Sequence, residues 1–245
     1  MTDPLVADLR RVVGAGAVRS DPIELALYAR DASLISGEAG LVCFARTADE
    51  LVAVVKACSA NGRPFVPRGS GTGLAGGATP AGDVPPVVIV TTKMNRILEV
   101  DEDQRVAWVE PGVLNLDLSR AVENLGLHFA PDPSSQQSCS IGGNVANNSG
   151  GPHCLLYGVT NAHVLAVEVV LPDGSLAMLG GVDPEPAGLD LRGAFVGSEG
   201  TMGIATRIAV RLTALPPSVE TLLADFAAMR DAAAAVTGVI SAGIV

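Results

Sequence analysis

The stretch Pro67-Arg68-Gly69-Ser70-Gly71-Thr72-Gly73-Leu74-Ala75-Gly76-Gly77 is the most informative part of this sequence. It places five glycines within nine residues, which removes side chains from one surface of a loop and leaves backbone N–H groups free to approach an anion. With Arg68 beside it, such a loop is typical of a site for a phosphate or a pyrophosphate. A plain glycine-rich turn is the simpler alternative, although a turn needs only one or two glycines.

The residues that follow argue against two familiar phosphate loops. Gly71-x-Gly73-x-x-Gly76 matches the fingerprint of NAD-binding Rossmann folds, which requires a helix to start in the loop so that its N-terminus meets the pyrophosphate. Residues 77–86 instead hold three prolines and two glycines, which cannot build that helix. A Walker A loop also fails, because no Gly-Lys-Ser/Thr closes the run.

Composition limits the class of protein. The 245 residues are 48% hydrophobic, enough for one large domain or two small ones. Acidic residues outnumber basic ones by 26 to 16, and this net charge of −10 argues against nucleic acid as a partner. The start has no signal-peptide pattern and no stretch is long enough to span a membrane, so we expect a cytoplasmic location. The four cysteines lack CxxC pairing, so we expect reduced thiols and no metal site.

Hydrophobic periodicity predicts an α+β chain with many short strands and few long helices. Helices are expected over residues 3–14, 49–61 and 115–125, and strands over 64–67, 87–90, 97–100, 106–109, 164–171, 175–178 and 204–212. A turn at Pro172-Asp173-Gly174 is expected to join two of these strands as a hairpin. After Pro216-Pro217 we expect a strand over 221–226 and a helix over 227–236. Two such elements cannot bury their faces alone, which suggests that the chain stops inside a second domain.

Two further segments share the polar, glycine-rich character of the first. Residues 131–151 carry many hydrogen-bonding side chains and glycines, and residues 197–204 alternate glycines with small polar residues just before an expected strand. A long polar stretch within a hydrophobic chain points to a ligand, with a surface Ω-loop as the alternative. Three such segments predict a long ligand that is touched at several points, and a dinucleotide has that length.

The order and spacing of several motifs resemble one family. They are Tyr28-x-x-Asp31, the 67–73 loop, Val109-Glu110-Pro111-Gly112-Val113, Pro131-Asp132-Pro133-Ser134, Ser140-Ile141-Gly142-Gly143-Asn144, Tyr157-Gly158 and the 197–204 segment. Over about residues 20–215 the chain is similar to the FAD-binding domain of the vanillyl-alcohol oxidase/para-cresol methylhydroxylase (PCMH-type) superfamily. Within it, the match is with the glycolate oxidase subunit GlcD and D-lactate dehydrogenase branch of FAD-linked oxidases. The resemblance implies a two-subdomain FAD-binding domain over 1–215, divided into about 1–103 and 104–215, and the beginning of an incomplete, truncated C-terminal cap domain over 216–245.

The resemblance also implies a set of cofactor residues. The backbone of residues 67–73 would bind the FAD pyrophosphate, residues from 131 to 151 would line the flavin, and the last two positions would contact the adenosine or the flavin edge. The complete set is Pro67, Arg68, Gly69, Ser70, Gly71, Thr72, Gly73, Pro131, Asp132, Ser138, Gly142, Gly143, Asn144, Asn148, Ser149, Gly151, Gly200 and Ile204. Some relatives attach flavin through a histidine in the glycine loop. This loop contains none, which implies non-covalent FAD.

The function implied by the resemblance is oxidation of a 2-hydroxy acid, such as glycolate or D-lactate, by hydride transfer to flavin. Members of this branch are about twice as long, and their second half carries the substrate pocket, so we name no catalytic residue here. Of the three histidines, only His153, in the polar 131–151 neighbourhood, merits a test. The alternatives are an FAD-binding module without its own turnover, or a flavoenzyme resembling alkylglycerone-phosphate synthase. A split enzyme would have a partner chain carrying the cap domain or the electron acceptor.

Overall fold

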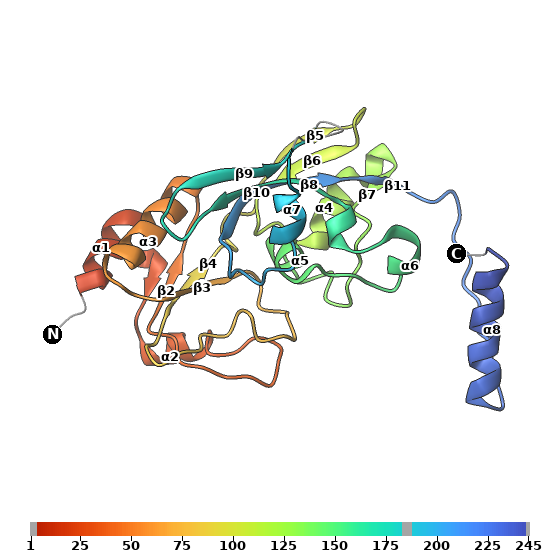
Figure 1. The fold of residues 1–245 in the computed structure, drawn as a ribbon, viewed down its shortest axis with the longest axis horizontal. Helices are drawn as coiled ribbons and strands as arrows, with labels where there is room; N and C mark the ends of the chain where they lie inside the picture. Colours follow the sequence, from red (N-terminus) through yellow and green to blue (C-terminus); the bar gives the residue numbers. More distant parts are fainter. Residues whose placement is uncertain (1–3, 183–187, 244–245) are drawn as a thin grey trace.

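The computed structural model describes residues 4–182 and 188–243. Within that part of the chain, two larger sheets lie next to each other and helices pack against both (Figure 1). A small two-stranded sheet, made of β7 (Leu127–His128) and β11 (Thr213–Ala214), lies at the far end of the second sheet. The fold is therefore α+β, as the hydrophobic pattern predicted.

The first sheet has the strand order β1-β2-β4-β3. Its strands are β1 (Val18–Arg19), β2 (Leu41–Phe44), β3 (Phe65–Arg68) and β4 (Val87–Val90). β2 and β3 both pair in parallel with β4, while β1 is antiparallel to β2. Helices α1 (Pro4–Val13) and α3 (Ala48–Ala60) cover one face, and α2 (Pro22–Ala26) contributes Leu25 to the other. Because both faces are covered, β4 is apolar throughout and fully buried.

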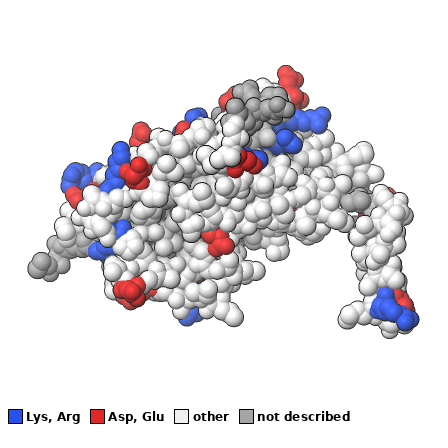
Figure 2. All heavy atoms as spheres, in the orientation of Figure 1, with Lys and Arg blue, Asp and Glu red and all other residues white. Residues whose placement is uncertain are grey.

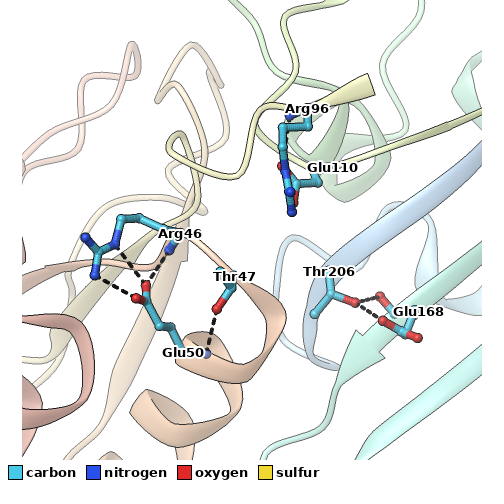
Figure 3. Close-up of polar contacts among 7 residues, drawn as sticks. All are labelled: Arg46, Thr47, Glu50, Arg96, Glu110, Glu168 and Thr206. Atoms are coloured by element: carbon cyan, nitrogen blue, oxygen red, sulfur yellow. Dashed lines mark hydrogen bonds and ion pairs between the residues drawn. The ribbon is translucent and has the colours of Figure 1, made fainter. Parts of the chain in front are cut away.

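Helix α3 illustrates how local sequence fixes an element. Thr47 precedes the helix, and its hydroxyl oxygen accepts a hydrogen bond of 3.1 Å from the backbone N–H of Glu50 (Figure 3). The Glu50 carboxylate reaches back to the backbone N–H of Arg46 at 2.8 Å and to its guanidinium. These contacts satisfy donors at the helix start, while Leu51, Val54, Val55 and Cys58 bury the opposite stripe.

The second sheet has the strand order β5-β6-β10-β8-β9 and all its pairings are antiparallel. Its strands are β5 (Ile97–Asp101), β6 (Val106–Val109), β8 (Val164–Val170), β9 (Leu176–Gly180) and β10 (Ile204–Arg211). The helices near it are α4 (Asn115–Val122), α5 (Ile141–Asn147), α6 (Cys154–Tyr157) and α7 (Leu191–Phe195), with short 3-10 turns η2 (Glu123–Leu125) and η3 (Thr160–Ala162). A third 3-10 turn, η1 (Ala15–Ala17), follows α1 and packs on the core of the first sheet. The inner face packs on α4, α5 and α7 around the fully buried Phe129.

Buried polar contacts help to hold this sheet. The Glu110 carboxylate is buried and accepts hydrogen bonds from the backbone N–H and the guanidinium of Arg96, at 2.8 Å and 2.7 Å. On the neighbouring strands, the Thr206 hydroxyl donates to the Glu168 carboxylate at 2.7 Å (Figure 3). A buried charge is tolerated when it is paired and hydrogen-bonded in this way.

The two sheets share part of one core. Val170 at the end of β8 and Ile204 at the start of β10 are buried among residues of α1, α3 and the first sheet. At the same junction the Ser59 hydroxyl of α3 donates to the Pro172 carbonyl oxygen at 2.8 Å. The second sheet therefore supplies packing that the first sheet needs.

Most of the predicted elements are confirmed, and the differences have physical reasons. The expected strand over 221–226 is wrong, because this segment pairs with no strand among the residues that the structure describes, and Leu222 and Leu223 are exposed. The expected helix over 227–236 exists but runs from Met229 to Ser241 as α8, which stands apart from the body (Figures 1 and 2). The first residue of the helix expected over 3–14 lies outside the described residues. No helix in the described residues is long and apolar enough to cross a membrane.

Candidate functional site

A cavity of about 700 Å³ opens where the two sheets meet, and all three glycine-rich segments line it. The loop after β3 forms one wall, α5 and its flanking residues form another, and the 197–204 segment leading into β10 completes it. The predicted cofactor residues in its lining are Pro67, Arg68, Gly69, Ser70, Gly71, Thr72, Gly73, Gly142, Gly143, Asn144, Asn148, Ser149, Gly200 and Ile204. The fold thus brings together positions that lie more than a hundred residues apart in the sequence.

Four predicted cofactor residues are not part of this lining. Pro131 is buried, and its carbonyl oxygen accepts a 2.9 Å hydrogen bond from the side chain of Asn115. Ser138 is exposed and bonds to a neighbouring turn. Asp132 and Gly151 pack against each other, since a Cβ on Gly151 would lie 2.5 Å from the Asp132 carbonyl carbon. Their part in cofactor binding stays a prediction.

The glycines allow the three segments to touch. A Cβ on Gly69 would lie 2.5 Å from the hydroxyl oxygen of Ser140, directly before α5. A Cβ on Gly77 would lie 2.6 Å from a carboxylate oxygen of Glu199 in the third segment. A Cβ on Gly200, which has φ of 80°, would meet the ring of Pro67. Glycine is therefore required here for close approach between segments, as well as for any approach to a ligand.

Backbone hydrogen bonds fix the third segment to α5. The N–H of Gly197 donates to the carbonyl oxygen of Val145 at 2.9 Å, and the N–H of Glu199 donates to that of Ala146 at 2.9 Å. Glu199 adopts a left-handed conformation with φ of 52°, which is unusual for a residue with a side chain. These contacts make the two cavity walls one continuous structure.

Arg68 has a structural role within the glycine loop. Its side chain is buried, and its Cζ lies 5.5 Å from the centre of the Tyr28 ring. Its Nη1 donates to the carbonyl oxygen of Ala78 at 3.2 Å. Burial lowers the pKa of Arg68, while the nearby Asp31 carboxylate works in the opposite direction. Gly71, with φ of 72°, lies against this guanidinium, and a Cβ there would be 2.7 Å from the Arg68 Cζ. Arg68 therefore ties the two ends of the loop together beneath its exposed backbone.

The polar 131–151 stretch contains a helix that the sequence analysis did not predict. The Ser140 hydroxyl accepts from the backbone N–H of Gly143 at 3.3 Å and so caps α5, whose Ile141 and Val145 point into the core. The buried Asn144 side chain accepts a 2.9 Å hydrogen bond from Asn115. The apolar pair four residues apart was the available signal for this helix.

One buried polar atom of the cavity lining has no partner among the described residues, the hydroxyl oxygen of Ser198. Asp31 also lines the cavity; burial works to raise its pKa, but bonds from Ser33, Ala78 and Thr79 lower it. Buried polar atoms normally find partners, so the Ser198 hydroxyl is available to a ligand. Neither Ser198 nor Asp31 was among the predicted cofactor residues, although both belong to the motifs that carry the resemblance.

The three histidines lie close to one another and differ in their partners. Burial lowers the pKa of His128 and of His163, whose rings contact the carbonyl oxygens of Thr213 and Tyr157. His153 is exposed, and its Nδ1 lies 2.5 Å from a carboxylate oxygen of Asp132. Since Pro133 and Gly150 line the cavity beside this pair, the Asp132–His153 contact joins two segments of its wall.

Comparison with known proteins places this cavity in context. Residues 39–180 match the family described as FAD binding domain. The chain is 45% identical over 201 residues to the glycolate oxidase subunit GlcD of Bacillus subtilis, covering 82% of this chain and 42% of that protein. It is 40% identical over 193 residues to the D-lactate dehydrogenase of Anaerostipes hadrus, covering 78% of this chain and 40% of that protein.

The fold is also found in a solved structure. A crystal structure of p-cresol methylhydroxylase with substrate bound aligns with a TM-score of 0.73 at 23% identity, covering 88% of this chain and 44% of that one. This similarity confirms the predicted fold class. The chain spans less than half the length of the curated relatives it matches.

Proposed function

Because this chain belongs to the FAD binding domain family, as the sequence resemblance predicted, we propose that it forms the flavin site of an enzyme that oxidises a 2-hydroxy acid such as glycolate or D-lactate. The observation that carries the proposal is the single cavity on which three glycine-rich segments converge. Its volume of about 700 Å³ falls within the range of roughly 300–1,000 Å³ that is usual for small-molecule and cofactor sites. The names of the relatives supply the substrate class.

The residues present fit FAD on structural grounds. The loop of residues 69–73 presents backbone with little side-chain cover, and Arg68 holds that loop from beneath, which suits the pyrophosphate. The unpartnered Ser198 hydroxyl suits the hydrogen-bonding groups of a nucleotide. No histidine occurs in residues 67–77, so the proposal is for non-covalent FAD.

The chemistry divides between the cofactor and the chain. FAD, when bound, supplies the redox step by accepting a hydride from the α-carbon of the hydroxy acid. The chain would bind and orient the cofactor through the walls described above, and backbone hydrogen bonds from the 197–204 segment to α5 hold that part of the cavity together. The hydroxyl proton of the substrate would pass to solvent water as the 2-oxo acid forms.

The test is reconstitution followed by anaerobic reduction. The purified chain is incubated with FAD, freed of excess cofactor, and its visible spectrum is recorded before and after adding glycolate or D-lactate. We expect bound flavin that bleaches with the hydroxy acid and stays oxidised with propionate, which lacks the hydroxyl. Protein that retains no FAD would refute the site. Flavin that binds and never bleaches would refute turnover by this chain and favour a binding module that works with another chain.

A further inference from the structure

A second cavity, of about 280 Å³, lies beside the end of α1 and shares no lining residue with the larger one. Three of the 16 basic residues of this acidic chain line it: Arg19, Arg46 and Lys93. They come from β1, from the residues after β2, and from the turn after β4, so the fold gathers them from separate parts of the sequence. Thr91, two residues before Lys93, lines the larger cavity.

Arg46 is held in place on one side and open on the other. Its Nε and Nη2 donate to the two carboxylate oxygens of Glu50 at 3.3 Å and 2.7 Å (Figure 3). Nη2 also donates to the carbonyl oxygen of Val13 at the end of α1, at 2.8 Å. A guanidinium carries five N–H donors, and the two on Nη1 have no hydrogen bond among the described residues. Arg46 is therefore oriented in advance and keeps donors for a further acceptor.

Arg19 has the same arrangement. Its Nε lies 2.9 Å from a carboxylate oxygen of Glu24, and its Nη1 donates to the carbonyl oxygen of Gly16. Its Cζ lies 5.6 Å from the centre of the Phe44 ring, which lines the same cavity. The Nη2 donors have no partner within residues 4–182 and 188–243. Two arginines thus present pre-oriented donors to one small space.

Lys93 leaves the local charge unbalanced. Glu24 and Glu50 offset the two arginines, but Lys93 is exposed and has no ion pair or hydrogen bond in the part of the chain that the structure describes. Gly14 and Gly16 also line this cavity, and a Cβ on either glycine would find no atom within 4 Å. The cavity therefore has a positive charge without a partner and room beside it.

We propose that this cavity binds a small oxyanion, either a phosphate or a carboxylate group, between Lys93 and the free guanidinium edges of Arg19 and Arg46. Charged donors that are already held by neighbouring groups lose little freedom on binding, and their bonds to an oxyanion are among the stronger hydrogen bonds. The site is distinct from the flavin cavity and does not depend on the proposed reaction.

The test is calorimetric titration of the FAD-loaded protein with inorganic phosphate and, separately, with acetate, at constant ionic strength. Bound FAD keeps phosphate from the glycine loop. We expect saturable binding of at least one of the two ions at a single site, and the preferred ion identifies a phosphate or a carboxylate ligand. Lys93 is exposed, and solvent screens an exposed ion pair, so Lys93→Gln should weaken binding about two- to fivefold.

Two variants make the result specific. Lys93→Arg keeps the charge and should retain most of the binding, and Lys56→Gln removes an exposed lysine of α3 that does not line the cavity and should bind like the unaltered protein. An unchanged flavin spectrum in Lys93→Gln reports an intact fold. Absence of saturable heat with both ions in the unaltered protein would overturn the proposal. Equal weakening in Lys93→Gln and Lys56→Gln would also overturn it, because the effect would then be general electrostatics.

Discussion

Gly71→Ala provides a quantitative test of how the glycine loop is built. Gly71 has φ of 72°, and its missing Cβ leaves room for the Arg68 guanidinium. The left-handed backbone conformation costs an alanine about 1–2 kcal/mol relative to glycine. The alanine also displaces Arg68 from the Ala78 carbonyl oxygen, and a hydrogen bond of a charged group is worth about 1.5–3 kcal/mol. We expect a total loss of about 2.5–5 kcal/mol, shared between folding and FAD binding.

The assay is a double-mutant cycle with Arg68→Ala, which measures both the free energy of unfolding in urea and the dissociation constant of FAD. In the Arg68→Ala background, Gly71→Ala should cost only the backbone part, about 1–2 kcal/mol. Gly126→Ala is the matched control, because Gly126 has φ of 67° and open space where a Cβ would lie.

Two results would refute this reasoning. An equal cost of Gly71→Ala with and without Arg68 would show that the guanidinium does not fill the space beside Gly71. A Gly71→Ala cost no larger than that of Gly126→Ala would show that only backbone conformation matters at this position.

Three further predictions concern the wall of the cavity and the core behind it. Asp132→Ala and His153→Ala should each weaken FAD binding, and by similar factors in the single and double variants, because each removes the same 2.5 Å side-chain contact between two wall segments; fluorescence titration checks this, and additive losses would contradict it. Burial lowers the pKa of His163 in the folded state, so the unfolded chain takes up the proton more readily. The free energy of unfolding should therefore fall as the pH drops below about 6.5. Urea unfolding across this range should show a smaller change of that free energy with pH in His163→Gln. Phe129→Ala should lower the free energy of unfolding by about 3–5 kcal/mol, since the ring is completely buried in the core beneath the second sheet. A decrease of less than about 1 kcal/mol, measured by urea unfolding, would argue against that packing.

The sequence was informative where periodicity and turn chemistry act locally. The run Val87–Val90 indicated a strand buried on both faces, and Pro172-Asp173-Gly174 indicated a hairpin whose Gly174 has φ of 80°. The absence of a helix after the glycine loop was also predicted, and residues 69–86 form only turns and bends. These features depend on neighbouring residues, so a single sequence reveals them.

Contacts between distant segments were less accessible. The sequence showed a bare backbone beside Arg68, yet it could not show that this side chain folds under Gly71 instead of standing free. The capped helix α5 was hidden by its polar composition, because only two of its buried residues, Ile141 and Val145, are large and apolar. The expected strand over 221–226 failed for the opposite reason, since an apolar segment forms a strand only where a partner strand is available.

The shared core has a consequence for how the molecule folds. Val170 and Ile204 complete the packing around α3, and Ser59 bonds across the same junction. A fragment that ends near residue 103 would lack these side chains and expose the apolar surface they cover. We therefore expect residues 4–215 to unfold in one cooperative transition, with equal midpoints by fluorescence and circular dichroism. The cofactor cavity at that junction would then form only when both sheets have folded, which makes cofactor binding a direct report on the completed fold.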